Sequence, residues 1–260
     1  MLSILDCCYN NFRFGDKWLS DFGGIIYNED GWKISNGLTS NKITAKLGNH
    51  DGELYLGQSY NPRTITIPIF IQNDIDLDEF YAWLLNGEQE LEFEYSGRKI
   101  NAVLDNQIDI TSYYNGDYKG LSTLNFIAYD PYWKPIQDTY TTISSPKVND
   151  TKLIKTESNV DSYPIIKITP STLDRIKFSI NDEIVILDLI DNSVGREITI
   201  DCENEEVYDI RSEQKHNLFH IYYCTEYYIF PRLKPFVANK FKFLGGNVSE
   251  IKIYNNNRWL

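Results

Sequence analysis

The sequence is poor in the side chains that enzymes use for acid–base and nucleophilic chemistry. It has three histidines and four cysteines in 260 residues. It contains no GxSxG nucleophile elbow, no Gly-rich phosphate loop and no CxxC pair. Histidine is the side chain that titrates nearest neutral pH, so little general-base capacity is present. The sequence therefore predicts that the protein is not an enzyme, with no catalytic residue, no cofactor-binding residue and no metal ligand.

Basic charge and long apolar runs are also scarce. Lys and Arg number 25 against 37 Asp and Glu, which gives a net charge of −12 and a pI of about 4.7. Nucleic-acid binding and docking on anionic membranes both need clustered basic residues, so both are disfavoured. No apolar stretch approaches the roughly 18 residues of a membrane helix, so membrane insertion is not expected. The first residues reach Asp6 without a basic leader, unlike a secretory signal.

Cysteine is too infrequent for a disulfide framework. Cys7 and Cys8 are adjacent, and neighbouring cysteines rarely bridge to each other. Cys202 and Cys224 lie in strand-like segments, where free cysteines act as small core residues. We therefore expect a soluble protein that is made in a reducing compartment.

What the sequence does contain is aromatic residues (14%) and short alternating segments typical of β-strands. Residues 63–71 place Ile65 and every second residue after it on one face. Pro68 cannot donate to a ladder, so this strand is expected at a sheet edge or broken there. Further strands are predicted at 90–95, 98–104 and 121–129, with turns at Ser96–Gly97 and Asn115–Gly116.

One segment, about residues 76–86, is predicted to be helical. Leu77, Phe80, Tyr81 and Leu84 share a face at the 3.6-residue period, acids crowd the first turn, and Asn86–Gly87 supplies a stop. The first half is therefore predicted to be α+β, with a single helix against a sheet.

A domain boundary is predicted after residue 135. Pro131 and Pro135 disfavour regular structure there, and the stretch to Asp150 is rich in Thr, Ser and Pro. Beyond it the sequence is almost purely β, which predicts a sandwich. The expected strands are 163–168, 175–180, 183–187, 196–200, 207–210, 218–229, 240–243 and 249–254. The chain is thus expected to be mainly β, with domains 1–135 and 136–260.

Three groups of polar residues were considered as sites. Asp74, Asp76 and Asp78 begin like a calcium loop, but the later Gly and Glu are missing, so helix-capping acids are favoured. His216 and His220 have the spacing of a helical zinc pair but lie in a segment predicted to be a strand. The glutamates at alternate positions from 88 to 94 are expected to form a solvated strand face.

Several motifs, in order along the chain, resemble the distal tail (Dit) family of long-tailed bacteriophages. In the first half these are 11–15, Ser20–Gly23, Gly57 with Arg63–Ile67, the helix ending at Trp83–Leu84, the paired strands at 91–93 and 98–104, and Leu124–Trp133. In the second half they are Tyr163–Ile168, Ile198–Cys202 with Val207–Tyr208, Phe230–Leu233 and Leu244–Asn247. Here residues 234–243 separate the last two motifs more widely than in the compact version of the family.

This resemblance implies a ring-forming N-terminal domain followed by a galectin-like β-sandwich. It implies a homo-hexameric ring at the tail tip of the virion, with the tail tube protein on one face and a tail-associated hub (lysin) protein on the other. The tape-measure protein and a receptor-binding protein are further implied neighbours, and assembly would take place in the bacterial host cytoplasm. The second half, roughly 120 residues, has no room for the carbohydrate-binding module inserted in some relatives.

Two other functions were weighed. A carbohydrate-binding sandwich would stack sugars on exposed aromatic residues, and the second half offers Tyr222, Tyr223, Tyr227, Tyr228 and Trp259. Aromatic residues in strands are more often core or interface residues, so this is the alternative. A wall-degrading hydrolase with an unrecognised site is a further alternative, which the missing catalytic motifs disfavour.

Overall fold

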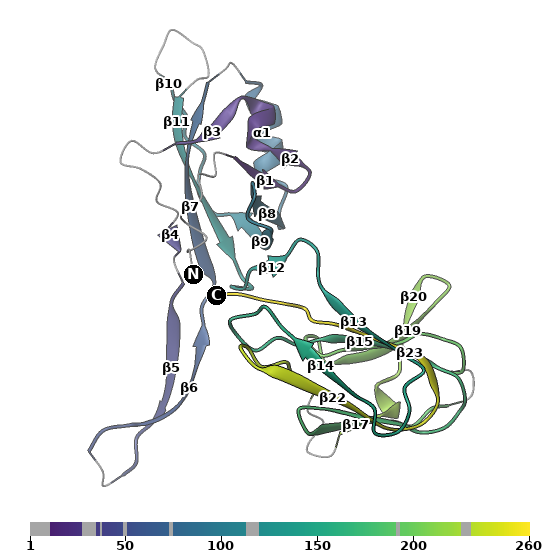
Figure 1. Ribbon diagram of the computed structural model, residues 1–260. Coiled ribbons are helices and arrows are strands. Elements are labelled where there is room, and N and C mark those ends of the chain that lie inside the picture. The colour runs from purple at the N-terminus through teal and green to yellow at the C-terminus, as the bar shows by residue number, and fades with distance from the viewer. Residues whose placement is uncertain are drawn as a thin grey trace. The chain divides into compact units, whose positions relative to one another are not determined.

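The computed structural model describes residues 11–27, 35–36, 38–48, 51–72, 75–112, 120–190, 193–224 and 230–260. Residues up to Ile136 form one compact unit, unit 1, and Gln137–Trp259 form another, unit 2 (Figure 1). The predicted mainly β fold is confirmed. Cys7, Cys8, Asp74, Asn115–Gly116 and 225–229, which include Tyr227 and Tyr228, lie outside the described residues, as do residues 1–6.

Unit 1 is built on one large antiparallel sheet. Its strands are β1 (Phe12–Phe14), β2 (Lys17–Trp18), β3 (Gly24–Ile26), β4 (Ser35–Asn36), β7 (Arg63–Ile71), β8 (Gln89–Phe93), β9 (Arg98–Leu104), β10 (Thr111–Ser112), β11 (Gly120–Ala128) and β12 (Lys134–Pro135). The main order is β2-β1-β8-β9-β11-β7-β3, while β10, β12 and β4 pair with β11, β9 and β7. A short 3-10 helix, η2 (Leu19–Phe22), links β2 to β3.

The strand β7 is the longest of this sheet, together with β11, and lies inside it. Every residue of β7 pairs with β11, from Arg63 opposite Ala128 to Ile71 opposite Gly120. The expected edge position is wrong, because β3 and β4 pair with the other side of β7. The Pro68 carbonyl accepts from the Tyr27 N–H at 3.0 Å, so its nitrogen faces the same side, just beyond the end of β3. The interruption thus falls in the neighbouring strands rather than in β7.

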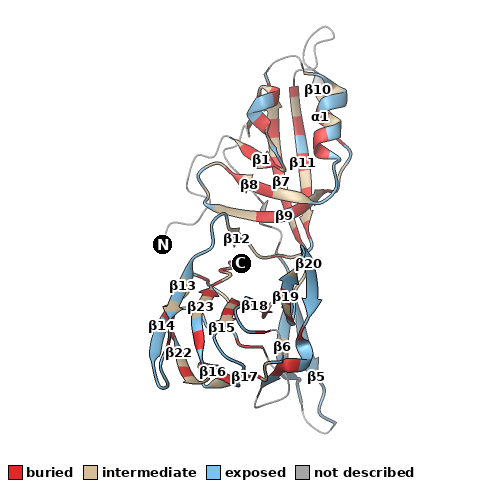
Figure 2. Ribbon diagram, turned by 90° about the vertical axis from the view of Figure 1, so that its right-hand side faces the viewer, coloured by how far each residue is buried: buried red, intermediate tan, exposed pale blue. Residues whose placement is uncertain are grey.

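The predicted helix is present as α1 (Leu77–Leu84). Asp76 is its N-cap, because its carboxylate accepts from the backbone N–H groups of Asp78 and Glu79. Phe80, Trp83 and Leu84 are the buried residues of the helix, so Trp83 replaces Leu77 in the predicted apolar face. The Trp83 ring stacks on Phe12 and Phe22, and its Nε1–H donates to the Phe14 carbonyl at 2.7 Å. This anchors α1 to β1 at the core of unit 1 (Figure 2).

A two-stranded sheet forms a separate element of unit 1 that the sequence did not predict. It consists of β5 (Ser40–Ala45) and β6 (Leu54–Tyr60), paired from Ser40 opposite Tyr60 to Ala45 opposite Leu54. A β-bulge lies between Ile43 and Thr44, next to Gly57, whose φ of 151° favours glycine. Neither strand pairs with the large sheet, so this β-hairpin, called the arm below, extends from the rest of unit 1 (Figure 1).

Unit 2 contains two antiparallel sheets. The first is ordered β13-β23-β15-β18-β19-β20 and the second β14-β22-β16-β17-β21. The strands are β13 (Tyr140–Ser144), β14 (Thr151–Lys155), β15 (Ile165–Pro170), β16 (Ile176–Ile180), β17 (Glu183–Leu187), β18 (Ile198–Asp201), β19 (Glu206–Arg211), β20 (Gln214–Asn217), β21 (Tyr222–Cys224), β22 (Ala238–Gly245) and β23 (Val248–Tyr254). Inward-facing residues of both sheets form one core, so unit 2 is the expected β-sandwich.

Several details of the predicted segments need correction. Residues 218–229 were expected to form a strand, but Phe219–Ile221 form a 3-10 helix, η3, and in the described part of this segment only Tyr222–Cys224 is extended. The stretch after Pro131 was expected to lack regular structure. Instead β12 pairs with β9, which leaves Pro135 at a short outer strand where its missing N–H is tolerated. The strands β13 and β14 were not predicted.

Candidate assembly surfaces

Three of the polar residues singled out in the sequence, Asp76, Glu90 and Glu92, have structural partners. Asp76 caps α1, as the capping interpretation predicts. Glu90 pairs with Lys99 and Glu92 with Arg13, each at 2.5 Å, so two of the four glutamates at alternate positions from 88 to 94 are paired with cations. These two ion pairs join neighbouring strands of the large sheet.

The two histidines do not share a helical face. His216 lies in β20 and His220 in η3, so their spacing of four residues does not place them side by side as on an α-helix. No group of three or more His, Cys, Asp or Glu side chains that could hold a metal occurs among the described residues. Burial raises the pKa of the Cys202 thiol well above its usual value, so this cysteine is an inert core residue.

Two of the aromatic residues considered for sugar binding are buried. Tyr222 is 1% exposed and stacks on Phe230, with ring centroids 4.6 Å apart. Trp259 is 7% exposed, and its Nε1–H donates to the Glu157 carbonyl at 2.8 Å. Tyr223 is exposed, on β21. Rings that are packed in the core cannot stack on a sugar, so these positions do not form a carbohydrate platform.

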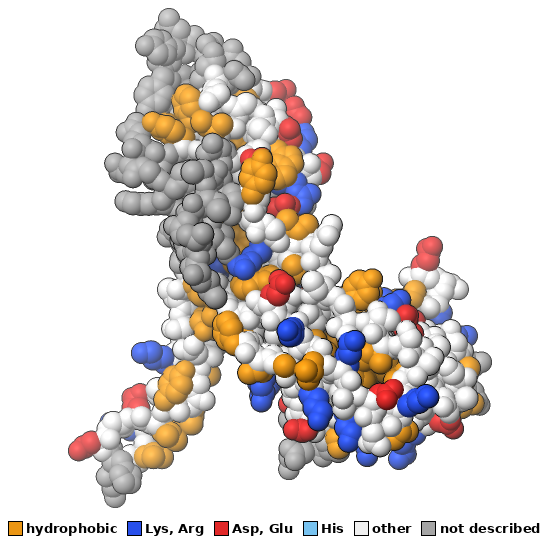
Figure 3. All heavy atoms as spheres, viewed as in Figure 1, with side chains coloured by type: hydrophobic (Ala, Val, Ile, Leu, Met, Phe, Trp, Pro, Cys, Tyr) orange, Lys and Arg blue, Asp and Glu red, His pale blue; other side chains and the backbone are white. Residues whose placement is uncertain are grey.

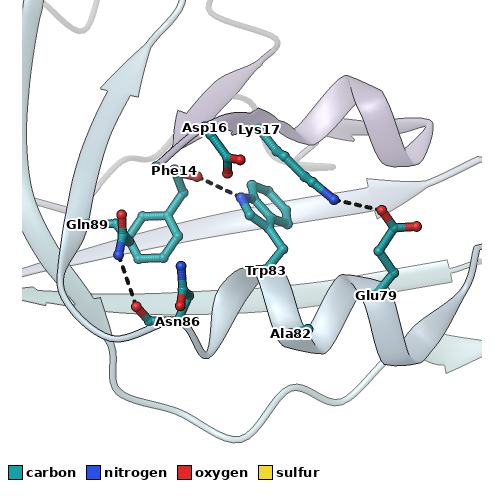
Figure 4. A pocket seen from close by; sticks show the side chains of 9 residues that line it. Phe14, Asp16, Lys17, Glu79, Ala82, Trp83, Asn86 and Gln89 are labelled. Carbon is teal, nitrogen blue, oxygen red and sulfur yellow. Dashed lines mark hydrogen bonds and ion pairs between the residues drawn. The ribbon is translucent and has the colours of Figure 1, made fainter.

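A polar cavity lies beside α1 in unit 1 (Figure 4). Its volume is about 270 Å³, at the lower end of the range of small-molecule sites. The lining residues are Phe14, Gly15, Asp16, Lys17, Glu79, Ala82, Trp83, Asn86 and Gln89. Lys17 Nζ lies 2.6 Å from Glu79 Oε1, and this contact raises the pKa of Lys17. Asp16, Lys17 and Glu79 are the ionisable groups of the lining, and Lys17 and Glu79 are engaged with each other.

The most distinctive surface is the arm, which exposes large apolar side chains on a two-stranded sheet. Hydrophobic side chains lie along much of its length (Figure 3). They are Ile43, Leu47, Leu54, Tyr55 and Leu56, which are 48–59% exposed. A β-hairpin without a packing partner is marginally stable in water, and contiguous exposed apolar residues mark protein interfaces. The arm therefore has the character of an element that packs against another surface.

Hydrogen bonds join the two chain segments at the base of the arm. The Asn61 backbone N–H donates to the Thr39 carbonyl at 3.0 Å, and its side-chain amide donates to the Thr39 hydroxyl at 2.9 Å. The Asn41 amide also donates to Asn61 Oδ1 at 2.5 Å. These bonds fix the point at which the chain leaves the arm for β7. The arm is thus presented from a defined base.

The arm was difficult to predict from the sequence. Both of its faces are exposed, so it lacks the alternation of apolar and polar residues by which half-buried strands are found. The signal that was present is the cluster Leu54–Leu56 in a segment rich in polar residues. Separately, no described helix has the length and apolar character that a membrane span requires.

Comparisons with known proteins agree with this architecture. Residues 21–128 match the model of the phage tail protein RIFT-related domain. The structure is similar to that of the SPP1 Dit (gp 19.1) protein, with a TM-score of 0.66 and 14% sequence identity over 96% of this chain and 99% of that chain. The phage P2 baseplate in its activated conformation with Ca matches with a TM-score of 0.50 and 14% identity, over 94% and 97% of the two chains. No curated protein sequence matches the chain.

The matched family domain covers most of unit 1, including α1, the arm and strands β7 to β11. Residues 21–128 therefore have the character of a phage tail protein RIFT-related domain. The chain shares the fold of the SPP1 Dit protein over nearly its whole length, in agreement with the resemblance of its sequence to the distal tail (Dit) family.

Proposed function

We propose that six copies of this chain form a ring at the tip of the phage tail, and that unit 1 closes the ring. The observation that carries the proposal is the arm, because its apolar side chains need a surface to pack against. In a cyclic ring each copy gives one element to a neighbour and receives the same element from the other neighbour. An arm that extends from a fixed base suits such an exchange.

The ring would join the tail tube protein on one face to a tail-associated hub protein on the other. The tape-measure protein and a receptor-binding protein would be further neighbours, and no catalytic step would be required of this chain. Support comes from the fold shared with the SPP1 Dit protein, which is described as a paradigm of the hub adsorption apparatus in phages that infect Gram-positive bacteria. We further propose that unit 2 is a galectin-like sandwich domain, and that the protein is made and assembled in the bacterial cytoplasm.

The carbohydrate-binding alternative is less well supported. Of the five aromatic residues proposed for it, Tyr222 and Trp259 are core residues and only Tyr223 is exposed among those described. A glycan array tests it directly: binding that is lost in Tyr223→Ala would favour the alternative over a purely structural role.

The native mass of the purified protein tests ring formation. Six chains of 30.3 kDa give about 182 kDa, which light scattering over a concentration series distinguishes from a monomer. We expect the hexamer, either from this chain alone or on addition of its hub partner. A chain that stays monomeric under both conditions would refute the proposal.

The triple variant Ile43→Thr, Tyr55→Thr and Leu56→Thr tests the role of the arm. Each residue is more than half exposed, so the melting temperature of the single chain should change little, whereas the ring should be lost. A matched control replaces the equally exposed Val148, Leu153 and Leu173 of unit 2 with Thr. A ring that survives the arm variant, or fails equally in the control, would contradict the proposed role of the arm.

A further inference from the structure

Arg63 is a buried cation, and two of its three guanidinium nitrogens lack a hydrogen-bond partner among the described residues. It begins β7 opposite Ala128 and shares the buried face of that strand with Ile65 and Ile67. Its side chain is 1% exposed. Within the described residues, neither its Nε nor its Nη2 has a hydrogen-bond partner. In the described part of the chain, the arginine therefore occupies a core position without the full set of hydrogen bonds that normally accompanies a buried charge.

By contrast, the buried carboxylate of Asp209 has partners. Asp209 in unit 2 is 2% exposed and accepts from Arg211 Nε at 2.8 Å, with Arg196 Nη1 at 3.8 Å from the same carboxylate. Burying a charge is unfavourable unless it is paired, and guanidinium groups normally recognise carboxylates through their planar donors. Burial lowers the pKa of Arg63 to about 10, in keeping with the absence of a neighbouring anion.

The position of Arg63 connects it to the arm. β6 ends at Tyr60, and Asn61 fixes the base of the arm two residues before Arg63. The other end of the arm carries Asp51 and Glu53, which are exposed. In the described part of the chain neither acid forms an ion pair. Among the described residues, a cation thus lacks an ion pair at the base of the arm, and two carboxylates lack one near its tip.

A ring brings such complementary ends together. The seven residues of β6 extend the arm by roughly 23 Å, close to the width of a small domain. In the proposed head-to-tail ring, the arm of one copy would lie across the next copy, with its tip toward the region from which that copy's own arm begins. Because Arg63 is covered in the single chain, the carboxylate reaches it only when the covering residues shift.

We propose that Arg63 is a carboxylate-binding site that is filled on ring formation by Asp51 or Glu53 from the arm of a second copy. The inference rests on the proposed ring and names the electrostatic contact that locks it. It also gives the buried arginine a role: its charge destabilises the single chain and forms a specific contact in the assembly.

The variant Arg63→Met tests this, because methionine keeps an unbranched apolar side chain and removes the charge. We expect the melting temperature of the single chain to rise, while the concentration at which half of the chains are assembled rises by roughly tenfold or more. Arg13→Met is the matched control. It removes the same charge from unit 1 but from an arginine that already pairs with Glu92, so ring formation should change much less.

The double variant Asp51→Asn and Glu53→Gln is a second, independent test. Both residues are exposed, so these changes leave the core of the single chain intact. It should weaken assembly as Arg63→Met does, and combining both sets should add little further loss. A ring that tolerates Arg63→Met, or a fully additive combination, would overturn the inference while leaving the ring itself established. A wild-type chain that never assembles, alone or with its hub partner, would instead overturn the proposed function and this inference with it.

Discussion

At the scale of single residues, Arg63 offers a prediction that needs no assembly. A lone cation in the core is destabilising, so Arg63→Met should raise the free energy of unfolding of the single chain by on the order of 2–3 kcal/mol at neutral pH. The pKa of Arg63 is lowered from 12.5 to about 10 in the folded chain. The penalty is therefore complete below about pH 10 and falls as the folded form loses the proton above it.

The measurement is urea unfolding of both proteins, at concentrations where they are monomeric, over a pH series. The stability difference between Arg63→Met and wild type should be constant between about pH 7 and pH 9 and shrink as the pH passes about 10. If Arg63→Met were less stable than wild type at every pH, the arginine would have a partner within the single chain.

Trp83 gives a second prediction at this scale. Its Nε1–H is buried and donates to the Phe14 carbonyl, while its ring stacks on Phe12 and Phe22. Trp83→Phe keeps an aromatic ring but removes the donor, so it should cost about 1–3 kcal/mol in thermal or urea unfolding. Tyr81→Phe on the same helix, only partly buried, is the control and should cost much less. Equal losses in both would show that the hydrogen bond contributes nothing.

At the scale of secondary-structure elements, the cap of α1 can be tested in the same way. Asp76→Ala removes the acceptor for the N–H groups of Asp78 and Glu79 and should cost about 1 kcal/mol. Asp76→Asn keeps an acceptor and should retain most of the stability. Both are measured by chemical unfolding. An alanine variant as stable as the asparagine variant would mean that the cap is not used.

How well an element could be predicted depended on whether one of its faces is buried. The strand β7 buries every second residue and α1 buries a helical face, so both follow from their apolar periodicity. Both faces of the arm are exposed, so its sequence lacks the alternation of apolar and polar residues that predicts a strand. The segment around Phe219 has strong β propensity, yet it turns as η3 because Ile221 and Tyr222 pack into the core there.

The candidate surfaces were harder to predict than the elements. Arginine is normally exposed, so nothing in the sequence around Arg63 indicates that its guanidinium is covered. The burial of Tyr222 and Trp259 likewise depends on partners distant in sequence, such as the Glu157 carbonyl. Contacts of this kind arise from tertiary packing, which local periodicity does not encode. The family motifs, by contrast, are local, and Arg63–Ile67 did identify the strand that carries the buried cation.

At the scale of the whole molecule, we infer that the two units are independent domains. Each has its own hydrophobic core, and no buried residue is shared between the two. A segment of about 120 residues buries enough surface to fold alone. Residues 137–260 expressed separately should therefore unfold cooperatively. Calorimetry of the full chain should show two transitions, one of them at the melting temperature of the separate segment. A separate segment that stays unfolded would show that unit 2 depends on unit 1.

The arm has one further consequence, which concerns what happens when assembly goes wrong. Its two strands form a sheet of their own, so β5 and β6 each leave one edge with unpaired backbone groups. Head-to-tail contacts close into a ring only if the rotation between copies is correct, and otherwise continue as an open filament. Filaments seen by electron microscopy in overexpressed protein would thus be the same interface without closure. The geometry at the base of the arm would then determine whether the copies form a closed ring or an open filament.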